Sequence, residues 1–198
     1  MKKINKNILI ATGGTGGHIF PSLSLAKFLG KNYNLQMVSD NRGLKYLENN
    51  KNIKVKIINS GTIYKKNFLH IISGASKIVT AFIYSVCFLI YSRPNLIIGM
   101  GGYSSFPICI AGFLLRVPII IYENNLIIGR ANKFLLPVVK KIMLSTKNTA
   151  GIHPKYNKKS FVCGYILNEN IYNLDNPKKK SLSHKEISLL IMGGSQSA

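Results

Sequence analysis

The sequence predicts an α/β domain built around a parallel sheet, and three observations carry that prediction. Short apolar runs of strand length recur along the chain, and helical patterns lie between most of them. Two glycine clusters, Gly13–Gly17 and Gly99–Gly102, directly follow two of these runs, as in turns that lead from a strand into a helix. Apolar residues make up 46% of the 198 residues, which is ample for a buried core.

The expected elements alternate along the chain. The first helix is expected to start at Ser22 and to reach Leu29, and a last short strand is expected over Ser160–Gly164. Because ligands of parallel α/β sheets bind at the loops after the strands' carboxyl ends, the two glycine clusters are expected to share one crevice. The other expected strands are Ile8–Thr12, Leu35–Ser39, Val55–Asn59, Leu96–Gly99, Ile119–Tyr122 and Lys141–Leu144.

The first glycine cluster is the strongest functional signal in the chain. Gly13, Gly14, Gly16 and Gly17 let the backbone approach a ligand closely and leave free N–H groups at a helix N-terminus, which suits phosphate. The pattern matches neither common phosphate loop, because His18 stands where a Walker loop needs lysine and the dinucleotide fingerprint lacks its last glycine. A glycine-rich turn without a ligand is the alternative.

His18 stands where the expected helix begins. A helix N-terminus disfavours the imidazolium, so the ring is expected to stay neutral and able to accept a proton. The alternative is a residue beside the helix cap with no catalytic role. The sequence holds no His, Cys or carboxylate motif with metal-ligand spacing, so no metal site is predicted.

Two further segments follow predicted strands and carry polar groups. The second glycine cluster continues into Tyr103-Ser104-Ser105 and again offers a turn into a helix, with hydroxyls attached. Tyr122-Glu123-Asn124-Asn125 ends another strand, and Glu123 is the sole acid in a long basic stretch. Its carboxylate is expected either to orient a sugar hydroxyl or assist a base, or else simply to pair with a lysine.

The formal net charge of +21 arises largely from missing acids. A basic surface attracts nucleic acid, anionic lipid or phosphorylated substrate. Compositional drift toward Lys, Asn and Ile is the competing explanation, although drift does not account for the near absence of Glu. The acids are Asp40, Glu48, Glu123, Glu169, Asp175 and Glu186.

The cysteines and the N-terminus indicate a cytoplasmic protein. Cys87, Cys109 and Cys163 are odd in number and widely spaced among apolar residues, so they are expected to be reduced and mostly buried. The apolar stretch after Met1-Lys2-Lys3 is too short for a signal peptide and runs straight into the glycine loop.

The segment Ile78–Ser92 carries no charge and is closed by Lys77 and Arg93. A buried core helix is one interpretation. The other is a helix apolar on more than one face, with one face left for a lipid surface and basic residues around it. A bilayer span is the least favoured, because it needs about 20 residues and the segment lies between strands of one sheet.

These motifs together resemble the MurG family. Its members are membrane-associated enzymes that transfer N-acetylglucosamine from UDP-GlcNAc to undecaprenyl-diphospho-muramoyl-pentapeptide (lipid I), forming lipid II. The matching blocks occur in the family's order across the whole chain: Gly13–Pro21, Gly99–Tyr103, Tyr122–Asn125, Gly129–Lys133 and Gly193–Ala198.

The resemblance implies a glycosyltransferase B fold, in which two Rossmann-like domains face one another across a cleft. Residues 1–164 would form the N-terminal, acceptor-side domain and residues 165–186 a linker. Residues 187–198 would form the first strand and glycine turn of a donor domain that is otherwise missing, so the chain alone is expected to be inactive. The expected location is the cytoplasmic face of the bacterial cell membrane. Other cell-wall enzymes are possible partners, and nucleic acid is not an expected partner.

The resemblance also implies roles for individual residues. His18 matches the family's candidate base for the acceptor's 4-hydroxyl, and Glu123 is the second candidate catalytic residue. The implied chemistry is inversion at the sugar's anomeric carbon without metal or cofactor. The positions that match UDP-GlcNAc contacts are Thr15, Gly16, Gly17, Asn125 and Ser195. The positions expected to face the lipid I diphosphate are Gly13, Gly14, Gly101, Gly102 and Tyr103.

Three departures from the family pattern qualify these roles. The family's His-Glu-Gln-Asn is here Tyr122–Asn125, which keeps the acid and the last amide. Asn168 stands where the family has an arginine near the donor diphosphate, and its amide cannot supply that charge. The donor domain is absent after Ala198, so the chain is either part of a longer protein or the product of a broken frame.

A non-catalytic membrane-surface module that binds polyprenyl diphosphate or anionic lipid is the alternative function.

Overall fold

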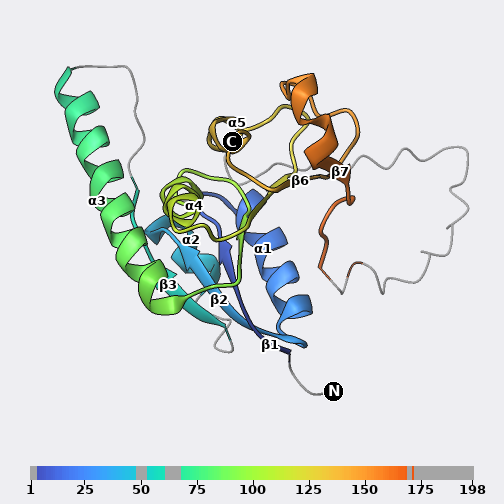
Figure 1. Cartoon of the computed structure of the whole chain (residues 1–198), viewed down its shortest axis with the longest axis horizontal. Helices are drawn as coiled ribbons and strands as arrows, with labels where there is room; N and C mark the ends of the chain where they lie inside the picture. The colour runs from blue at the N-terminus through green and yellow to red at the C-terminus, as the bar shows by residue number, and fades with distance from the viewer. Residues whose placement is uncertain (1–3, 48–52, 61–67, 169–170, 172–198) are drawn as a thin grey trace, which may run out of the picture.

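A seven-stranded parallel sheet forms the centre of the molecule (Figure 1), with the strand order β3-β2-β1-β4-β5-β6-β7. The computed structural model describes residues 4–47, 53–60, 68–168 and 171. The predicted α/β class and parallel sheet are confirmed. The strands are β1 (Ile4–Ala11), β2 (Tyr33–Ser39), β3 (Lys54–Ile57), β4 (Leu96–Gly99), β5 (Ile119–Glu123), β6 (Lys141–Leu144) and β7 (Ser160–Val162).

The helices divide into two layers, one on each face of the sheet. Helices α1 (Gly16–Leu29) and α2 (Asn41–Leu47) cover one face, where Ile8 and Ile10 of β1 join their core cluster. Helices α3 (Phe68–Ser92), α4 (Ser105–Leu114) and α5 (Arg130–Leu135) cover the other face, where Leu9 and Ala11 point. Figure 1 shows α3 and α1 on opposite sides of the strands. This alternation along β1 is the two-residue period of a strand buried on both faces.

The strand order reverses direction beside β1. The chain passes from β1 to β2 and β3 on one side, then returns to place β4 on the other side of β1. The loops after β1 and β4 therefore flank the switch point of the sheet, which is where open α/β sheets bind ligands. The two glycine clusters span these loops, with Gly16 and Gly17 opening α1 and Gly99 ending β4.

Helix α1 begins earlier than the sequence predicts. It starts at Gly16, with Thr15 as its N-cap, and contains Pro21, whereas the prediction starts it at Ser22. Pro21 lacks an N–H, so the carbonyl of Gly17 four residues earlier has no intrahelical partner. That carbonyl instead accepts a hydrogen bond from Asn124 Nδ2 at 2.8 Å, which lets the helix continue through the proline.

The prediction that the cysteines are mostly buried is wrong. Cys109 is buried in α4, and burial raises the pKa of its thiol to about 12. Cys87 and Cys163 are exposed. Cys87 lies on the outer face of α3, where apolar neighbours in the sequence do not imply burial.

Helix α3 is apolar on both its inner and its outer side. Ala81, Ser85 and Leu89 are buried against the sheet and its helices. The opposite side exposes Ile83 and Tyr91, the latter with 89% of its surface accessible. The stretch Gly74–Ser92 is long and apolar enough to cross a membrane by length and composition. One side of α3 is packed against the domain, as the core-helix interpretation expects. Contact of the exposed side with a lipid surface stays a prediction.

A short 3₁₀ helix, Pro154–Lys159, leads into β7. The predicted linker at 165–186 lies outside the described residues except for 165–168 and 171, and the predicted strand and glycine turn at 187–198, with Ser195, lie outside them altogether. The division of the chain at 164 and 186 therefore stays a prediction.

Candidate active site at the two glycine loops

The loops after β1 and β4 are packed directly against each other. A Cβ on Gly102 would lie 2.6 Å from the carbonyl oxygen of Gly13, and a Cβ on Gly13 would collide with Ser104 Oγ. Gly14, Gly101 and Gly102 have φ values of 86°, 88° and 82°, in the left-handed region that favours glycine. The two glycine clusters are therefore in direct contact, and a ligand crevice shared by them stays a prediction.

Asp40, which follows β2, holds the two loops together. Its Oδ1 accepts hydrogen bonds from the N–H groups of Gly14 at 3.2 Å and Gly43 at 3.1 Å. Its Oδ2 accepts from Ser104 Oγ at 2.8 Å and from Arg42 Nε at 3.0 Å. One buried carboxylate therefore connects the first glycine loop, the second glycine loop and the start of α2.

These contacts lower the pKa of Asp40. Burial by itself raises the pKa of the carboxyl, but hydrogen bonds from Arg42, Ser104 and Gly14, with the charge of Arg42, outweigh burial and leave the pKa below its usual 3.8. Asp40 is consequently ionised near neutral pH, and its charge is neutralised by Arg42 at an Oδ2–Nη2 distance of 2.6 Å.

His18 lies in the first turn of α1 and packs against the second glycine loop. Its Cε1 and Nδ1 atoms lie 2.9 and 3.0 Å from the position that a Cβ on Gly101 would take. Any side chain at Gly101 would displace the ring. Within the described part of the chain, the buried Nδ1 has no hydrogen-bond partner. The imidazole is therefore held in place by packing against the second glycine loop.

The surroundings of His18 favour its neutral form. Burial lowers the pKa of the imidazole below 6.5, and the Glu123 carboxylate and the Met100 backbone, which both raise it, do not offset burial. The prediction of a neutral ring is supported, but its main cause is burial under the second glycine loop.

Glu123 organises the loop after β5. It is 1% exposed. Oε1 accepts hydrogen bonds from the backbone N–H of Asn125 at 3.1 Å and from Asn125 Nδ2 at 2.7 Å. Oε2 accepts from the N–H of Gly129 at 2.8 Å and from Asn132 Nδ2 at 3.0 Å. In the described structure Glu123 bonds to backbone and amide N–H groups and to no lysine, so the predicted pairing of Glu123 with a lysine is wrong.

Asn132 links the same loop to the second glycine loop. Besides Glu123, its Nδ2 donates to the Tyr122 carbonyl at 3.0 Å, and it lies 3.7 Å from the Cβ position of Gly101. Asn124 ties the loop to α1 through Gly17, as described above. The end of β5, the two glycine loops and the start of α5 therefore form one connected site around His18.

Comparison with known proteins identifies the family of this domain. The model of the glycosyltransferase family 28 N-terminal domain matches residues 8–144. The chain belongs to glycosyltransferase family 28. The match spans both glycine loops, His18 and Glu123.

Two curated relatives resemble the chain over nearly its whole length. Each is named UDP-N-acetylglucosamine--N-acetylmuramyl-(pentapeptide) pyrophosphoryl-undecaprenol N-acetylglucosamine transferase. The Pelagibacter ubique protein is 36% identical over 195 residues and the Rickettsia bellii protein 32% over 196; each alignment covers 98% of this chain and 53% of the relative. The chain thus spans about half the length of the curated relatives it matches, and the resemblance drawn from the sequence is confirmed.

A solved structure of Acinetobacter baumannii MurG has the same fold. It superposes with a TM-score of 0.69 at 23% identity, covering 87% of this chain and 50% of that protein. The predicted Rossmann-like fold, with the chain as the N-terminal half of a glycosyltransferase B arrangement, is confirmed at the level of the fold.

The remaining predicted site residues of this family 28 domain surround the same loops. Thr15 is the N-cap of α1, and Gly16 and Gly17 form its first turn. Asn125 is exposed, with its amide oriented by Glu123, and the preceding Asn124 bonds to Gly17. Tyr103 is half-buried after the second glycine loop.

The departures from the family pattern have structural correlates. Tyr122 is buried, and its hydroxyl donates to the Gly164 carbonyl at 3.3 Å and accepts from the Ile166 N–H at 3.2 Å. It therefore anchors the segment after β7. Asn168 lies exposed at the end of that segment.

The sequence predictions gave no site role to Asp40 or Asn132, and named Ser104 only as a hydroxyl after the second glycine cluster. Asp40 directly follows a predicted strand, a position at the ligand-binding edge of a parallel sheet, and that was a usable signal. No signal in the sequence pairs it with Ser104. Among the described residues, no group of three or more His, Cys, Asp or Glu side chains has a metal-binding arrangement.

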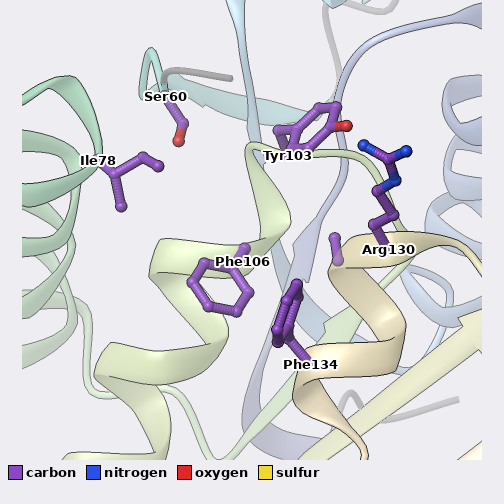
Figure 2. Close-up of a pocket in the computed structure, with 7 residues that line it drawn as sticks. Ser60, Ile78, Tyr103, Phe106, Arg130 and Phe134 are labelled. Atoms are coloured by element: carbon purple, nitrogen blue, oxygen red, sulfur yellow. The ribbon is translucent and has the colours of Figure 1, made fainter. Parts of the chain in front are cut away.

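A pocket adjoins the second glycine loop on the α3 side of the sheet (Figure 2). Its cavity volume is about 460 Å³. Figure 2 shows the Tyr103 hydroxyl and the Arg130 guanidinium on the same side of the pocket, with the Phe106 and Phe134 rings close together. The lining residues are Ser60, Ile78, Tyr103, Phe106, Arg130, Ala131 and Phe134.

Proposed function

We propose that this family 28 chain forms the acceptor-side half of a lipid II-forming glycosyltransferase. The enzyme would move N-acetylglucosamine from UDP-GlcNAc to undecaprenyl-diphosphate-linked MurNAc-pentapeptide in peptidoglycan synthesis. The names of the Pelagibacter and Rickettsia relatives state this transfer for those proteins. The observation that carries the proposal here is a half-buried His18, whose pKa is lowered by burial, in contact with the second of two converging glycine loops.

His18 is assigned the role of general base. Its imidazole would take the proton from the acceptor's 4-hydroxyl while that oxygen forms a bond to the anomeric carbon of N-acetylglucosamine. The bond from that carbon to UDP would break with inversion, and UDP would leave with the electron pair. A pKa below 6.5 keeps the ring unprotonated at neutral pH, as a base requires. We also propose that this transfer needs no metal ion.

The glycine loops are assigned to the charged groups of the substrates. The first turn of a helix leaves N–H groups without intrahelical partners, and Gly16 and Gly17 provide such groups in α1 without side chains that would block approach. We assign Thr15, Gly16, Gly17 and Asn125 to the UDP-GlcNAc side. The lipid I diphosphate is assigned to the loops at Gly13, Gly14, Gly101, Gly102 and Tyr103.

The exposed side of α3 is assigned to the cytoplasmic surface of the membrane. Val79, Ile83 and Tyr91 expose large apolar side chains on that side. Lys56 lies 5.6 Å from the centre of the Tyr84 ring, which adds a positive charge beside the apolar face. Apolar side chains flanked by cations are typical of helices that rest in the interface of anionic membranes.

The test of catalysis measures transfer of labelled N-acetylglucosamine from UDP-GlcNAc to lipid I. The 198-residue chain is assayed beside a version extended with the second half of the Pelagibacter relative. We expect transfer by the extended version and none by the chain alone, since the donor side comes from the second half. Failure of the extended version, with both halves folded by circular dichroism, would contradict the proposal. Transfer by the 198-residue chain alone would contradict the assignment of the donor side.

The exposed apolar side of α3 also favours a second candidate, a non-catalytic membrane-surface module. Flotation with vesicles of neutral or anionic lipid tests the membrane binding that both candidate functions include. We expect binding to anionic vesicles at low salt, weakened by Ile83→Glu and Tyr91→Glu. Phe28→Glu, on α1 across the sheet, is the matched control, because Phe28 is also exposed. Binding together with failed transfer by the extended enzyme would favour this second candidate.

A further inference from the structure

The pocket between α3, α4 and α5 combines an apolar interior with one cationic side chain. Its aromatic lining comes from Tyr103, Phe106 and Phe134, and Ile78 adds aliphatic surface. Arg130 is the charged member of the lining. Pockets that are mostly apolar, with a few placed polar groups, fit ligands of matching character. This pocket fits an apolar chain attached to an anionic head.

The aromatic side of the pocket is accessible to a ligand. Phe134 is 73% exposed although it belongs to a helix packed on the sheet. Its ring meets that of Phe106 edge to face, with centroids 6.4 Å apart and an interplanar angle of 72°. Covering the exposed Phe134 ring and the accessible part of Phe106 with an apolar chain removes their surface from water, which is favourable.

Arg130 is positioned at the mouth of the pocket by the active-site loop. It is the first residue of α5, whose N-cap Gly129 donates its N–H to Glu123 Oε2 at 2.8 Å. The next turn places Asn132 Nδ2 3.7 Å from the Cβ position of Gly101 in the second glycine loop. Arg130 itself is exposed, and within the described residues no carboxylate forms an ion pair with it. Its charge is therefore available to an anion bound at that loop.

We infer that this pocket binds the first isoprene units of a polyprenyl diphosphate, with the Arg130 guanidinium paired to the diphosphate and the Phe106 and Phe134 rings against the chain. The inference rests on the proposed function and adds a chain-binding subsite to the phosphate loops. Ile78 lines the pocket, and its neighbour Val79 is exposed on the apolar side of α3. A longer chain would pass from the pocket along α3 toward the membrane.

The test is calorimetric titration of the 198-residue chain with soluble probes below their micelle concentrations. The probes are inorganic diphosphate, geranyl diphosphate, farnesyl diphosphate and farnesol. We expect affinity to rise from diphosphate through geranyl to farnesyl diphosphate, because each added isoprene unit buries more apolar surface. Phe134→Ser is expected to weaken farnesyl diphosphate binding about tenfold and to leave inorganic diphosphate unchanged. Arg130→Gln is expected to weaken both about fivefold.

Matched controls come from the far end of α4. Phe113→Ser and Arg116→Gln remove an exposed aromatic ring and an exposed guanidinium outside the pocket, and both are expected to leave all affinities unchanged. Farnesyl diphosphate binding no tighter than inorganic diphosphate, or unchanged in Phe134→Ser, would overturn the inference. Equal binding of farnesol and farnesyl diphosphate, with Arg130→Gln silent, would overturn the pairing of Arg130 with the head group.

The two proposals fail in different ways. The isoprene subsite is overturned by the binding series alone, whereas the proposed transfer is judged by the extended enzyme. Failed transfer with intact, Phe134-dependent binding of farnesyl diphosphate would count against catalysis and support the pocket. Successful transfer, with farnesyl diphosphate binding no tighter than inorganic diphosphate, would support catalysis and count against the pocket.

Discussion

Ser104 Oγ donates a hydrogen bond to Asp40 Oδ2 at 2.8 Å, joining residues that are 64 positions apart. The same carboxylate accepts from the Gly14 N–H at 3.2 Å. Asp40 therefore couples the two glycine loops that surround His18. The family 28 site depends on this residue although Asp40 faces no substrate in our proposal.

Replacing Asp40 by Asn is expected to destabilise the domain and to loosen both loops. The amide keeps the size but removes the charge that Arg42 and Ser104 bond to, and hydrogen bonds to charged groups contribute about 1.5–3 kcal/mol each. Urea unfolding is expected to show a loss of that order for Asp40→Asn and a smaller loss for Ser104→Ala. A double variant whose loss equals the sum of both single losses would show that the two groups do not interact.

The stability contributed by Asp40 is expected to depend on pH in acid. Its folded pKa lies below the usual 3.8, so the contribution is full above pH 3.8 and is lost as pH falls through the folded pKa. The difference in unfolding free energy between the native chain and Asp40→Asn should shrink in that range. A difference that stays constant down to acid unfolding would contradict this account.

His18 is expected to titrate below pH 6.5 in the folded chain. Burial disfavours the imidazolium, so the unfolded chain binds this proton more readily than the folded one. Stability therefore falls as pH drops from about 6.5 to the folded pKa, a loss that His18→Gln should remove. NMR titration of the His18 ring measures the midpoint, and a midpoint at or above 6.5 would refute the argument.

In the extended enzyme, His18→Ala is expected to lower kcat by about 10²–10⁴, the usual contribution of a general base. The substrate KM values should change little, because the ring acts on a proton and not on binding. An unchanged kcat would leave His18 as a packing residue.

Gly102→Ala is expected to destabilise the domain by about 2–4 kcal/mol, from a left-handed φ and a collision with the Gly13 carbonyl. Gly164→Ala is the matched control, because Gly164 has φ 83° and nothing within 4 Å of its Cβ position. The control should lose only about 1–2 kcal/mol, the cost of the backbone conformation. Equal losses in urea unfolding would mean that the contact between the loops is not tight.

Glu123→Gln is expected to cost about 1.5–3 kcal/mol of stability, since an amide NH₂ would face the donors that now bond to the carboxylate. Removing the negative charge should also lower the pKa of His18 further, because the carboxylate raises it. NMR titration of His18 in this variant checks the second effect. A lowered kcat with unchanged stability and unchanged His18 titration would instead support Glu123 as a catalytic residue.

Much of the fold was predictable from local pattern. The strands at 96–99 and 141–144 have the predicted bounds, and the other strands differ from prediction by a few residues at their ends. The glycine clusters were predictable as loops because apolar runs precede them. The start of α1 was not, since a proline normally ends a helix, and only the distant Asn124 satisfies the carbonyl that Pro21 leaves free.

The predicted site is partly accounted for by the structure. The grouping of His18, the glycine loops and Asn125 follows from their positions after parallel strands, and the structure brings them together. The bonding of Glu123 could not be foreseen, because its donors Gly129 and Asn132 reach it only when α5 folds back over the end of β5. The expectation that Cys87 and Cys163 are buried failed, since apolar neighbours do not show which face of an element is covered.

The sequence by itself determined that this is an α/β domain with glycine at the turns after two strands, because hydrophobic period and glycine content are local properties. It also determined the family, since the motifs occur in order. Only the tertiary structure decided that Asp40 would join the loops and that partial burial would be the main cause of the neutral form of His18. Hydrogen bonding and desolvation depend on atoms contributed by distant segments, and the strand order alone brings those segments together.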